Sequence, residues 1–298
     1  MRADMELMDI YGAFFGMQSL LAPEYIVPAT IFAFGLWLWR RPGIGFWAWL
    51  TPRSIWGHRS HRLDLILFGI GRLLVLSGLL TRLTVTPFIA TWVADAIGSG
   101  AVEMSPWTLA ALMFVVGDLT LYWMHRVLHG WSAIWPLHAL HHSAEVMTPL
   151  TAYRHHPLMQ LIVPLGYSAV IGIVSGLAIG VLDAGPTVAE IAGVNAFLVI
   201  SHAALANFRH SHVWIGYGPV LERLFISPAQ HQIHHSTLPR HHGRNFGEVL
   251  SVWDWMFGTL YLTRGIEDVQ FGLEDEPKLT THTLRAALWE PLRRLGRG

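Results

Sequence analysis

Long apolar stretches alternate with short polar segments over most of this 298-residue chain. Five stretches come close to the roughly 20 residues that an α-helix needs to cross the hydrocarbon core of a bilayer. They cover 20–39, 63–81, 107–124, 158–182 and 188–208. A sixth stretch, 83–98, is shorter and contains Asp95 and three threonines, so we expect it to be interfacial or re-entrant. The pattern predicts an all-α membrane protein, a multi-span bundle of about four to five spans with additional interfacial helices.

The composition agrees with a membrane protein. Hydrophobic residues make up 52% of the chain and charged residues only 13%, with a mean hydropathy of +0.40, whereas soluble domains carry about 25% charged residues. The formal net charge is zero, which argues against a nucleic-acid partner. The chain has no cysteine, which excludes disulfides, thiolate metal sites, iron–sulfur clusters and thiol nucleophiles.

The arginines predict the orientation of the bundle. Segment 40–62 carries five of them and is therefore expected on the cytoplasmic side. If 63–81 then crosses outward and 107–124 returns, residues 125–157 and the residues after 209 form a cytoplasmic, histidine-rich helical cap, and 158–182 and 188–208 form a hairpin between them. Lys278 is the only lysine, which favours a GC-rich bacterium and hence a bacterial inner membrane. We expect N-terminal spans over 1–106, a central domain over 107–262 and a cytoplasmic tail over 263–298.

Three histidine clusters carry the candidate chemistry. One has the pattern H-x-x-x-H and two have the pattern H-x-x-H-H; their histidines are His125 and His129, then His138, His141 and His142, then His231, His234 and His235. On a helix, residues three and four apart share a face, so each cluster can aim two or three imidazoles at one point. Eight nitrogen ligands are too many for one ion and suit two. Imidazole binds zinc, copper, iron and nickel, so ligand type alone does not choose the metal.

Two carboxylates are candidates for orienting these imidazoles. Asp118 lies in an apolar stretch, where an ionisable residue is a functional candidate. It shares one helical stripe with Tyr122, His125 and His129, so we expect it to accept a hydrogen bond from a ligand imidazole. Asp254, in the aromatic segment after the third cluster, is expected to do the same.

Of the remaining histidines, one is a candidate ninth ligand, the role of three stays open, and three are expected at the surface. His210 lies just after the last apolar stretch and is the preferred additional ligand. Ligation by His156, His212 or His241 stays open. His58, His61 and His282 lack nearby partners in the sequence and are expected at the surface.

These motifs resemble the fatty acid hydroxylase superfamily, also called the sterol desaturase family. The resemblance spans roughly 110–260 and rests on 118–129, 138–142, 151–157, 207–212 and 227–259. It implies an integral membrane enzyme with two non-haem iron ions, held by the eight cluster histidines, that uses O2 and two electrons to hydroxylate or desaturate a lipid. The His-Pro-Gly-Gly motif of fused haem domains is absent, so a separate electron donor is expected, a ferredoxin or a b-type cytochrome with its reductase.

Two positions depart from the family pattern. Gly243 stands where an acidic residue is expected before Asn245, and Leu205 replaces a histidine that many relatives have two residues before Asn207. The second departure makes His210 the expected substitute ligand.

The expected substrate is a lipid C–H bond in a sterol, fatty acyl chain, ether lipid or isoprenoid, and the residues do not separate hydroxylation from desaturation. The main alternative is a membrane metal-binding or metal-transport protein. Such a protein should carry ionisable residues near the middle of several spans, whereas here they gather at the ends of the apolar stretches. A zinc hydrolase is disfavoured because no cluster has the H-E-x-x-H arrangement.

Overall fold

The computed structural model describes residues 2–16, 19–79, 85–98, 100, 102–182, 205–273 and 279–296. The first half contains α1 (Arg2–Phe15), α2 (Pro23–Arg40), α3 (Phe46–Leu50), α4 (Arg53–Trp56), α5 (Arg59–Leu76), α7 (Thr86–Ile97), α8 (Pro106–Gly130), α9 (Trp135–His142) and the 3-10 helix η1 (Pro149–Tyr153). The second half contains α10 (Met159–Val181), α13 (Asn207–Arg209), α14 (Gly218–Leu221), α15 (Pro228–His234), η3 (Pro239–His241), α16 (Val252–Met256), η4 (Leu279–Thr281) and α17 (Leu284–Arg294). Within these ranges the only β pairing is in isolated bridges. The predicted all-α class is confirmed.

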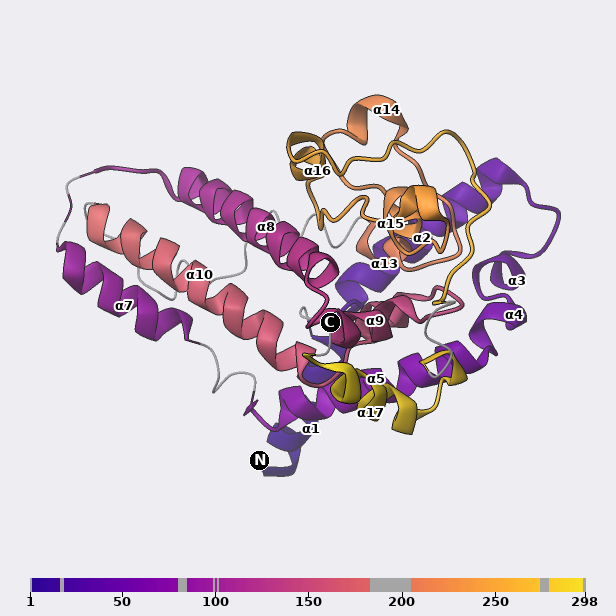
Figure 1. Ribbon diagram of the computed structural model, residues 1–298, viewed down its shortest axis with the longest axis horizontal. Helices are drawn as coiled ribbons and strands as arrows, with labels where there is room; N and C mark the ends of the chain where they lie inside the picture. Colours follow the sequence, from indigo (N-terminus) through magenta and orange to yellow (C-terminus); the bar gives the residue numbers. More distant parts are fainter. Residues whose placement is uncertain are drawn as a thin grey trace.

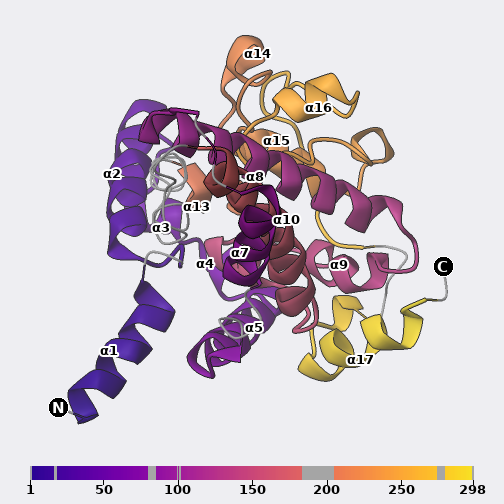
Figure 2. The ribbon, with the colours of Figure 1, turned by 90° about the vertical axis from the view of Figure 1, so that its left-hand side faces the viewer.

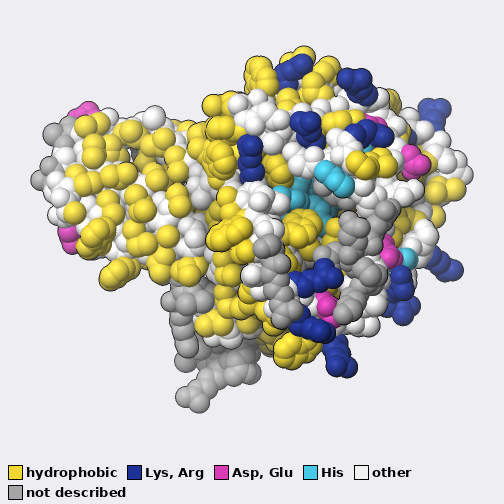
Figure 3. Space-filling view, viewed as in Figure 1, with side chains coloured by type: hydrophobic (Ala, Val, Ile, Leu, Met, Phe, Trp, Pro, Cys, Tyr) yellow, Lys and Arg dark blue, Asp and Glu magenta, His cyan; other side chains and the backbone are white. Residues whose placement is uncertain are grey.

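An elongated arm made of α7, α8 and α10 projects from a rounded head that contains most of the other helices (Figure 1). The visible surface of the arm consists mainly of hydrophobic side chains, whereas the dark blue arginines lie over the head (Figure 3). Such an arm suits a lipid environment, because large apolar surfaces are rarely left in water.

Small residues allow α7 to lie directly against α10. Gly172, Gly176 and Gly180 recur every fourth position of α10, and a Cβ on Gly176 would lie 2.6 Å from the carbonyl oxygen of Ala90 in α7. Close backbone approach at such small-residue stripes is typical of helix pairs in membranes. With twelve residues, α7 is too short to cross a bilayer alone. Within the stretch 83–98, expected to be interfacial or re-entrant, residues 86–97 form a helix supported by α10.

Two helices of the described chain are long and apolar enough to cross a membrane, Trp107–Gly130 within α8 and Met159–Val181, which is α10. They correspond to the predicted spans 107–124 and 158–182. The predicted spans 20–39 and 63–81 form α2 and α5, which do not meet the same criteria. The predicted span 188–208 and its preceding turn lie almost wholly outside the described residues. The structure thus supports two of the four to five expected spans.

Helix α5 differs from a lipid-surrounded span because it buries charged side chains against the head. Asp64 of α5 and Arg154, just after η1, form an ion pair of 2.8 Å in which both side chains are 0% exposed. Arg154 also donates to the carbonyl oxygen of Leu140 in α9, 2.9 Å away, and to Nδ1 of His282, 2.8 Å away. This network joins α5, α9 and the C-terminal segment around one buried guanidinium.

The same network corrects an expectation about isolated histidines. His61 and His282, expected at the surface, are 4% and 8% exposed. Nδ1 of His61 lies 3.0 Å from the Thr148 hydroxyl. Their partners come from segments far along the chain, which spacing in the sequence does not reveal.

Candidate metal centre

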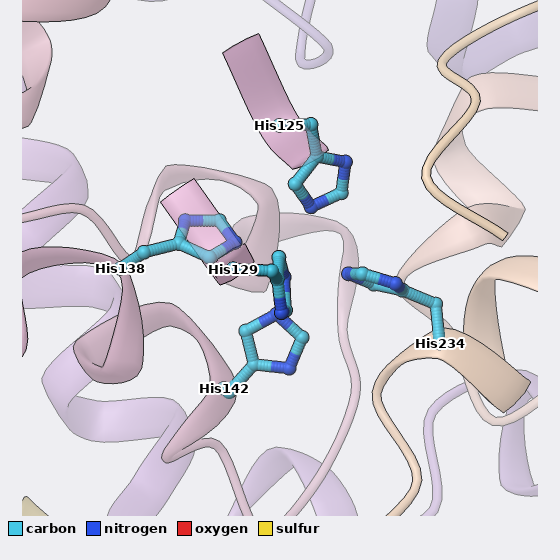
Figure 4. Close-up of side chains that lie close together, drawn as sticks. All are labelled: His125, His129, His138, His142 and His234. Carbon is cyan, nitrogen blue, oxygen red and sulfur yellow. The ribbon is translucent and has the colours of Figure 1, made fainter. Parts of the chain in front are cut away.

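Nine imidazoles converge where α8 meets α9 and α15, and they form two groups. The five-histidine group consists of His125, His129, His138, His142 and His234, and the four-histidine group consists of His141, His210, His231 and His235. Within each group the nearest ring nitrogens all lie within 4.8 Å of one another. Figure 4 shows the five-histidine group, with rings from α8, α9 and α15 pointing into one shared space. The structure brings together all nine histidines that the sequence selected.

Each H-x-x-H-H cluster serves both groups. In α9, His138 and His142 point to the five-histidine group and His141 to the other. In α15 the assignment is reversed, because His231 and the C-cap residue His235 point to the four-histidine group and His234 to the first. In each cluster the first and last histidines are four residues apart and share a helix face. The histidine between them points to the other group. Two such helices placed face to face therefore complete two sites at once.

Local sequence signals set the start of α15. Ser227 accepts a hydrogen bond from the Gln230 backbone, the Gln230 side chain accepts one from the Ser227 backbone, and Pro228 occupies the first helical turn. This capping box satisfies backbone donors that the helix leaves unpaired. Buried Glu222 also accepts from the Ser227 hydroxyl at 2.9 Å. These polar contacts at the N-terminus of α15 fix the orientation of the helix and thereby the direction of the histidines of the third cluster.

The four-histidine group has the dimensions of a metal site. Nε2 of His210 lies 3.2 Å from Nε2 of both His141 and His235, and 3.0 Å from Nε2 of His231. Ligands about 2.0–2.1 Å from a metal ion lie about 3.3 Å apart in a tetrahedron and about 3.0 Å apart at right angles. A neutral imidazole has only one N–H, so facing Nε2 atoms cannot all pair with one another. A cation between them would accept every lone pair.

In the five-histidine group, backbone carbonyls select the ring nitrogen that faces inward. Nδ1 of His125 donates to the carbonyl oxygen of Phe246 and Nδ1 of His234 to that of Arg244, each at 2.9 Å. With the proton on Nδ1, the Nε2 lone pair of each ring is free for a metal. The Nε2 atoms of all five histidines are buried without a hydrogen-bond partner. Because unsatisfied buried polar atoms cost about 1–3 kcal/mol each, the arrangement fits a bound cation.

Burial keeps the imidazoles neutral. It lowers the pKa of His138, His141 and His142 of α9, and of the three histidines of the third cluster, well below the usual value, and nearby imidazoles lower it further. Burial lowers the pKa of His210 to about 3. At neutral pH these rings hold lone pairs rather than positive charge, the form that binds metal.

Asp118 makes different contacts from the expected one. Its carboxylate accepts hydrogen bonds from the backbone N–H groups of Val249 and Leu250, at 2.9 and 3.0 Å, and from Nε1 of Trp253 at 2.9 Å. These contacts attach the 249–253 segment to α8 and involve no imidazole. The expected direct hydrogen bond between Asp118 and a ligand imidazole is therefore wrong. Both carboxylate oxygens instead accept from Val249, Leu250 and Trp253, which lie far along the chain.

Asp254 reaches a candidate ligand through one intervening residue. Its carboxylate oxygens accept the backbone N–H groups of Phe246 and Gly247, both at 2.8 Å, and the Thr259 hydroxyl donates to it at 2.6 Å. The carbonyl oxygen of Phe246 is the acceptor for Nδ1 of His125. Asp254 therefore holds the peptide that orients His125, rather than the imidazole itself.

The histidines whose role was open lie outside both groups. Nε2 of His156 donates to Leu288 O at 3.1 Å, and Nε2 of His212 donates to Trp49 O at 2.8 Å. Nε2 of His241 lies 3.3 Å from Glu267. His155, by contrast, stacks on the four-histidine group, with its ring centroid 4.7 Å from that of His141. The sequence did not predict this contact, because His155 lies outside the three histidine clusters.

The family departure at Gly243 is accommodated locally. Gly243 has a φ of +69°, a left-handed conformation that glycine adopts without strain. The Asn245 side chain that follows donates to Gln230 O at 3.1 Å and accepts from Tyr261 N at 2.7 Å. The turn after α15 is thus tied to that helix without an acidic residue at 243.

Taken together, the helical arm and the paired histidine groups define a candidate metal centre beneath apolar helices. Comparison with known proteins gives the family. A family model described as fatty acid hydroxylase matches residues 110–259, half of the chain, and this range contains all three clusters. The chain belongs to the fatty acid hydroxylase family.

The relatives oxidise different lipids, according to their names. An ornithine lipid hydroxylase from Rhizobium tropici is 28% identical over 158 residues, which cover 52% of this chain and 43% of the relative. An alkylglycerol monooxygenase from Danio rerio is 30% identical over 156 residues, 52% of this chain and 31% of the relative. A delta(7)-sterol 5(6)-desaturase from Aspergillus fumigatus is 28% identical over 151 residues, 47% and 46%. The matched part spans less than half the length of these relatives. No solved structure matches the chain.

Proposed function

We propose that this protein is a membrane-bound, O2-dependent oxidoreductase that hydroxylates or desaturates a lipid at a C–H bond, using two non-haem iron ions. The observation that carries the proposal is the pair of histidine groups: the inward nitrogens of the five-histidine group have no hydrogen-bond partner, and those of the four-histidine group face only one another. The nine histidines would hold the ions, five around one and four around the other.

Iron is the proposed metal because the chemistry must be redox chemistry. Imidazole also suits zinc, copper and nickel, but zinc has no redox activity. The names of the relatives, a hydroxylase, a monooxygenase and a desaturase, describe oxidations. Bound iron would supply the activation of O2 that side chains lack.

The overall reaction balances with two external electrons. For hydroxylation, R–H, O2, two electrons and two protons give R–OH and water; for desaturation, two neighbouring C–H bonds are lost and two waters form. The electrons would come from a separate donor protein, a ferredoxin or a b-type cytochrome with its reductase. In this scheme the chain's residues hold the ions in fixed geometry and keep the site dry, and no side-chain nucleophile is needed.

A place at a membrane is part of the proposal. Exposed apolar side chains cover the arm, among them Phe88, Trp92, Trp107, Ile162 and Ile173. The arginines of the head favour a cytoplasmic active site, and the membrane we propose is the bacterial inner membrane. We keep the division into N-terminal spans over 1–106, a catalytic domain over 107–262 and a tail over 263–298, with further spans beyond α8 and α10.

Metal transport is the runner-up, and the arm argues against it. Helix α10 contains no charged residue and no histidine over Met159–Val181. In α8 the ionisable residues begin at Asp118 and cluster at the C-terminal end. A permeation route would need ionisable ligands along the apolar arm.

Two measurements test the proposal. Purified protein, loaded anaerobically with ferrous iron and freed of unbound metal, should retain about two irons per chain. Lipids from cells with and without the gene should differ by a mass change of about +16 or −2, the change that oxygen insertion or loss of two hydrogens produces. A His138→Ala variant should abolish that change. Retention of well under two irons, or an unchanged lipid profile, would contradict the proposal.

A further inference from the structure

A small apolar cavity lies between α2 and the segment that carries His210. It has a volume of about 170 Å³ and is lined by Ala29 and Ala33 of α2, Trp56 of α4, Met147, Asn207 and Phe208, among others. Helices α2 and α13 lie next to each other (Figure 2). The 207–213 segment forms one wall and also contains His210 of the four-histidine group. The cavity and the candidate centre thus share a structural element.

One polar group in this cavity has no partner. The hydroxyl and imidazole side chains of the lining are engaged: Thr30 with Ile26 O, Thr51 with Trp47 O, Thr148 with His61, Ser211 with Phe208 O and His212 with Trp49 O. Asn207 is 5% exposed, and both its amide nitrogen and its amide oxygen lack a hydrogen-bond partner. A buried amide left unpaired is unfavourable in the free protein. It is explained if a ligand completes its hydrogen bonds.

We propose that this cavity binds a flexible hydrocarbon chain of the substrate, and that the Asn207 amide binds a hydrogen-bonding group on that lipid. This inference rests on the proposed function and narrows its substrate to acyl- or alkyl-chain lipids. An apolar cavity of about 150 Å³ holds one benzene molecule, so the volume here suits a segment of about six carbons. A flexible chain can place such a segment in the cavity, whereas a rigid, fused sterol nucleus cannot.

One wall of the cavity is formed by α2, a helix in the N-terminal part of the chain. It lies outside the family match at residues 110–259. Its inner face is formed by small residues, with Ala33 at 0% exposed, while Val27 on its outer face is 54% exposed. The small inner side chains leave the space that the lipid chain would occupy. We infer that α2 determines which chains are accepted.

The test uses photolabelling, which needs no turnover. Iron-loaded protein in lipid nanodiscs is irradiated with a palmitate analogue that carries a mid-chain diazirine, and labelled peptides are mapped by mass spectrometry. Met147 is 1% exposed and so inaccessible to bulk lipid. We expect label at Met147 in the wild type, several-fold less in Ala33→Leu, which fills the cavity, and wild-type labelling in Val27→Leu, the matched outward control. If Ala33→Leu does not fold, the smaller Ala29→Val takes its place.

The outcomes separate the inference from the proposed function. No label at Met147, or equal label in the filled and control variants, overturns the cavity proposal even if iron content and lipid oxidation are as proposed. Label from a diazirine-bearing cholesterol instead of the palmitate probe overturns the assignment to chain lipids. Loss of iron binding or of lipid oxidation in the wild type would count against the proposed function, whatever the labelling.

A separate variant tests the role of the Asn207 amide. Asn207→Leu keeps the side-chain size but removes the unpaired amide, so the lipid-free protein should melt at a higher temperature while the palmitate probe binds about three- to tenfold more weakly. Its iron content should match the wild type. A lower melting temperature with unchanged probe affinity would show that the amide serves the fold instead.

Discussion

The carboxylate of Asp254 and the imidazole of His125 are joined through a single residue, Phe246. Asp254 accepts the Phe246 N–H at 2.8 Å, and the carbonyl oxygen of Phe246 accepts from His125 Nδ1 at 2.9 Å. A carboxylate far along the chain therefore determines the orientation of a candidate ligand in α8 without touching it.

Replacement of Asp254 should weaken one ion selectively. In Asp254→Asn the amide cannot accept from both the Phe246 and Gly247 N–H groups, so the Phe246 peptide should shift. Loss of such an orienting contact typically lowers metal affinity about 10–100-fold. We expect weaker iron binding at the five-histidine group and unchanged binding at the other, measured by anaerobic iron titration. Glu267→Gln, near His241 and outside both groups, serves as the control; equal losses in the two variants would refute the link.

Histidine substitutions should sort by group and not by cluster. His138→Ala and His234→Ala come from different clusters but affect the five-histidine group, whereas His141→Ala and His231→Ala affect the four-histidine group. Each variant should retain about one iron per chain, because only one ligand set is damaged. Mössbauer spectra of iron-57-loaded protein should show the same residual site within each pair. Spectra that pair His138→Ala with His141→Ala would contradict the assignment.

The buried ion pair should be important for stability. Arg154→Ala leaves Asp64 unpaired in a site with no exposure, and removal of one partner of a buried pair costs about 3–5 kcal/mol. Arg59→Ala, which removes an exposed arginine 3.4 Å from Glu145, should cost less than about 1 kcal/mol. Chemical denaturation in detergent, followed by circular dichroism, compares the two variants. Similar losses would mean that the Arg154 network contributes little.

Acid should destabilise the C-terminal segment. Burial, assisted by Arg154, lowers the pKa of His282 to about 4, below its usual 6.5. In the unfolded chain this histidine binds a proton at higher pH than in the folded chain, so the stability that it contributes above pH 6.5 is lost as the pH falls towards about 4. His282→Asn should make this dependence shallower. Asparagine tolerates the φ of +53° at this position, and its oxygen can accept from Arg154. Melting temperatures between pH 4 and pH 7 measure the slope, and identical slopes in both proteins would exclude this origin.

Periodic patterns in the sequence predicted part of this molecule. The long apolar runs at 107–124 and 158–182 became the two long apolar helices, and the four-residue spacing of His125 and His129 placed them on one face. The assignment of His141 and His138 to different groups depends on how α9 and α15 face each other, which no local pattern specifies. The contacts of Asp118 and Arg154 likewise join segments far apart in the chain. The hydropathy of 63–81 also did not reveal that α5 directs Asp64 into a buried ion pair.

The shared use of α9 and α15 by both histidine groups has a consequence for assembly. Neither half of the centre can form alone, since docking the two helices creates all the crossed ligand sets in the same step. A displacement of either helix would disturb both ions together. Closure of the head should consequently prearrange both ligand sets, so a protein holding a single ion should already have the geometry that captures the second.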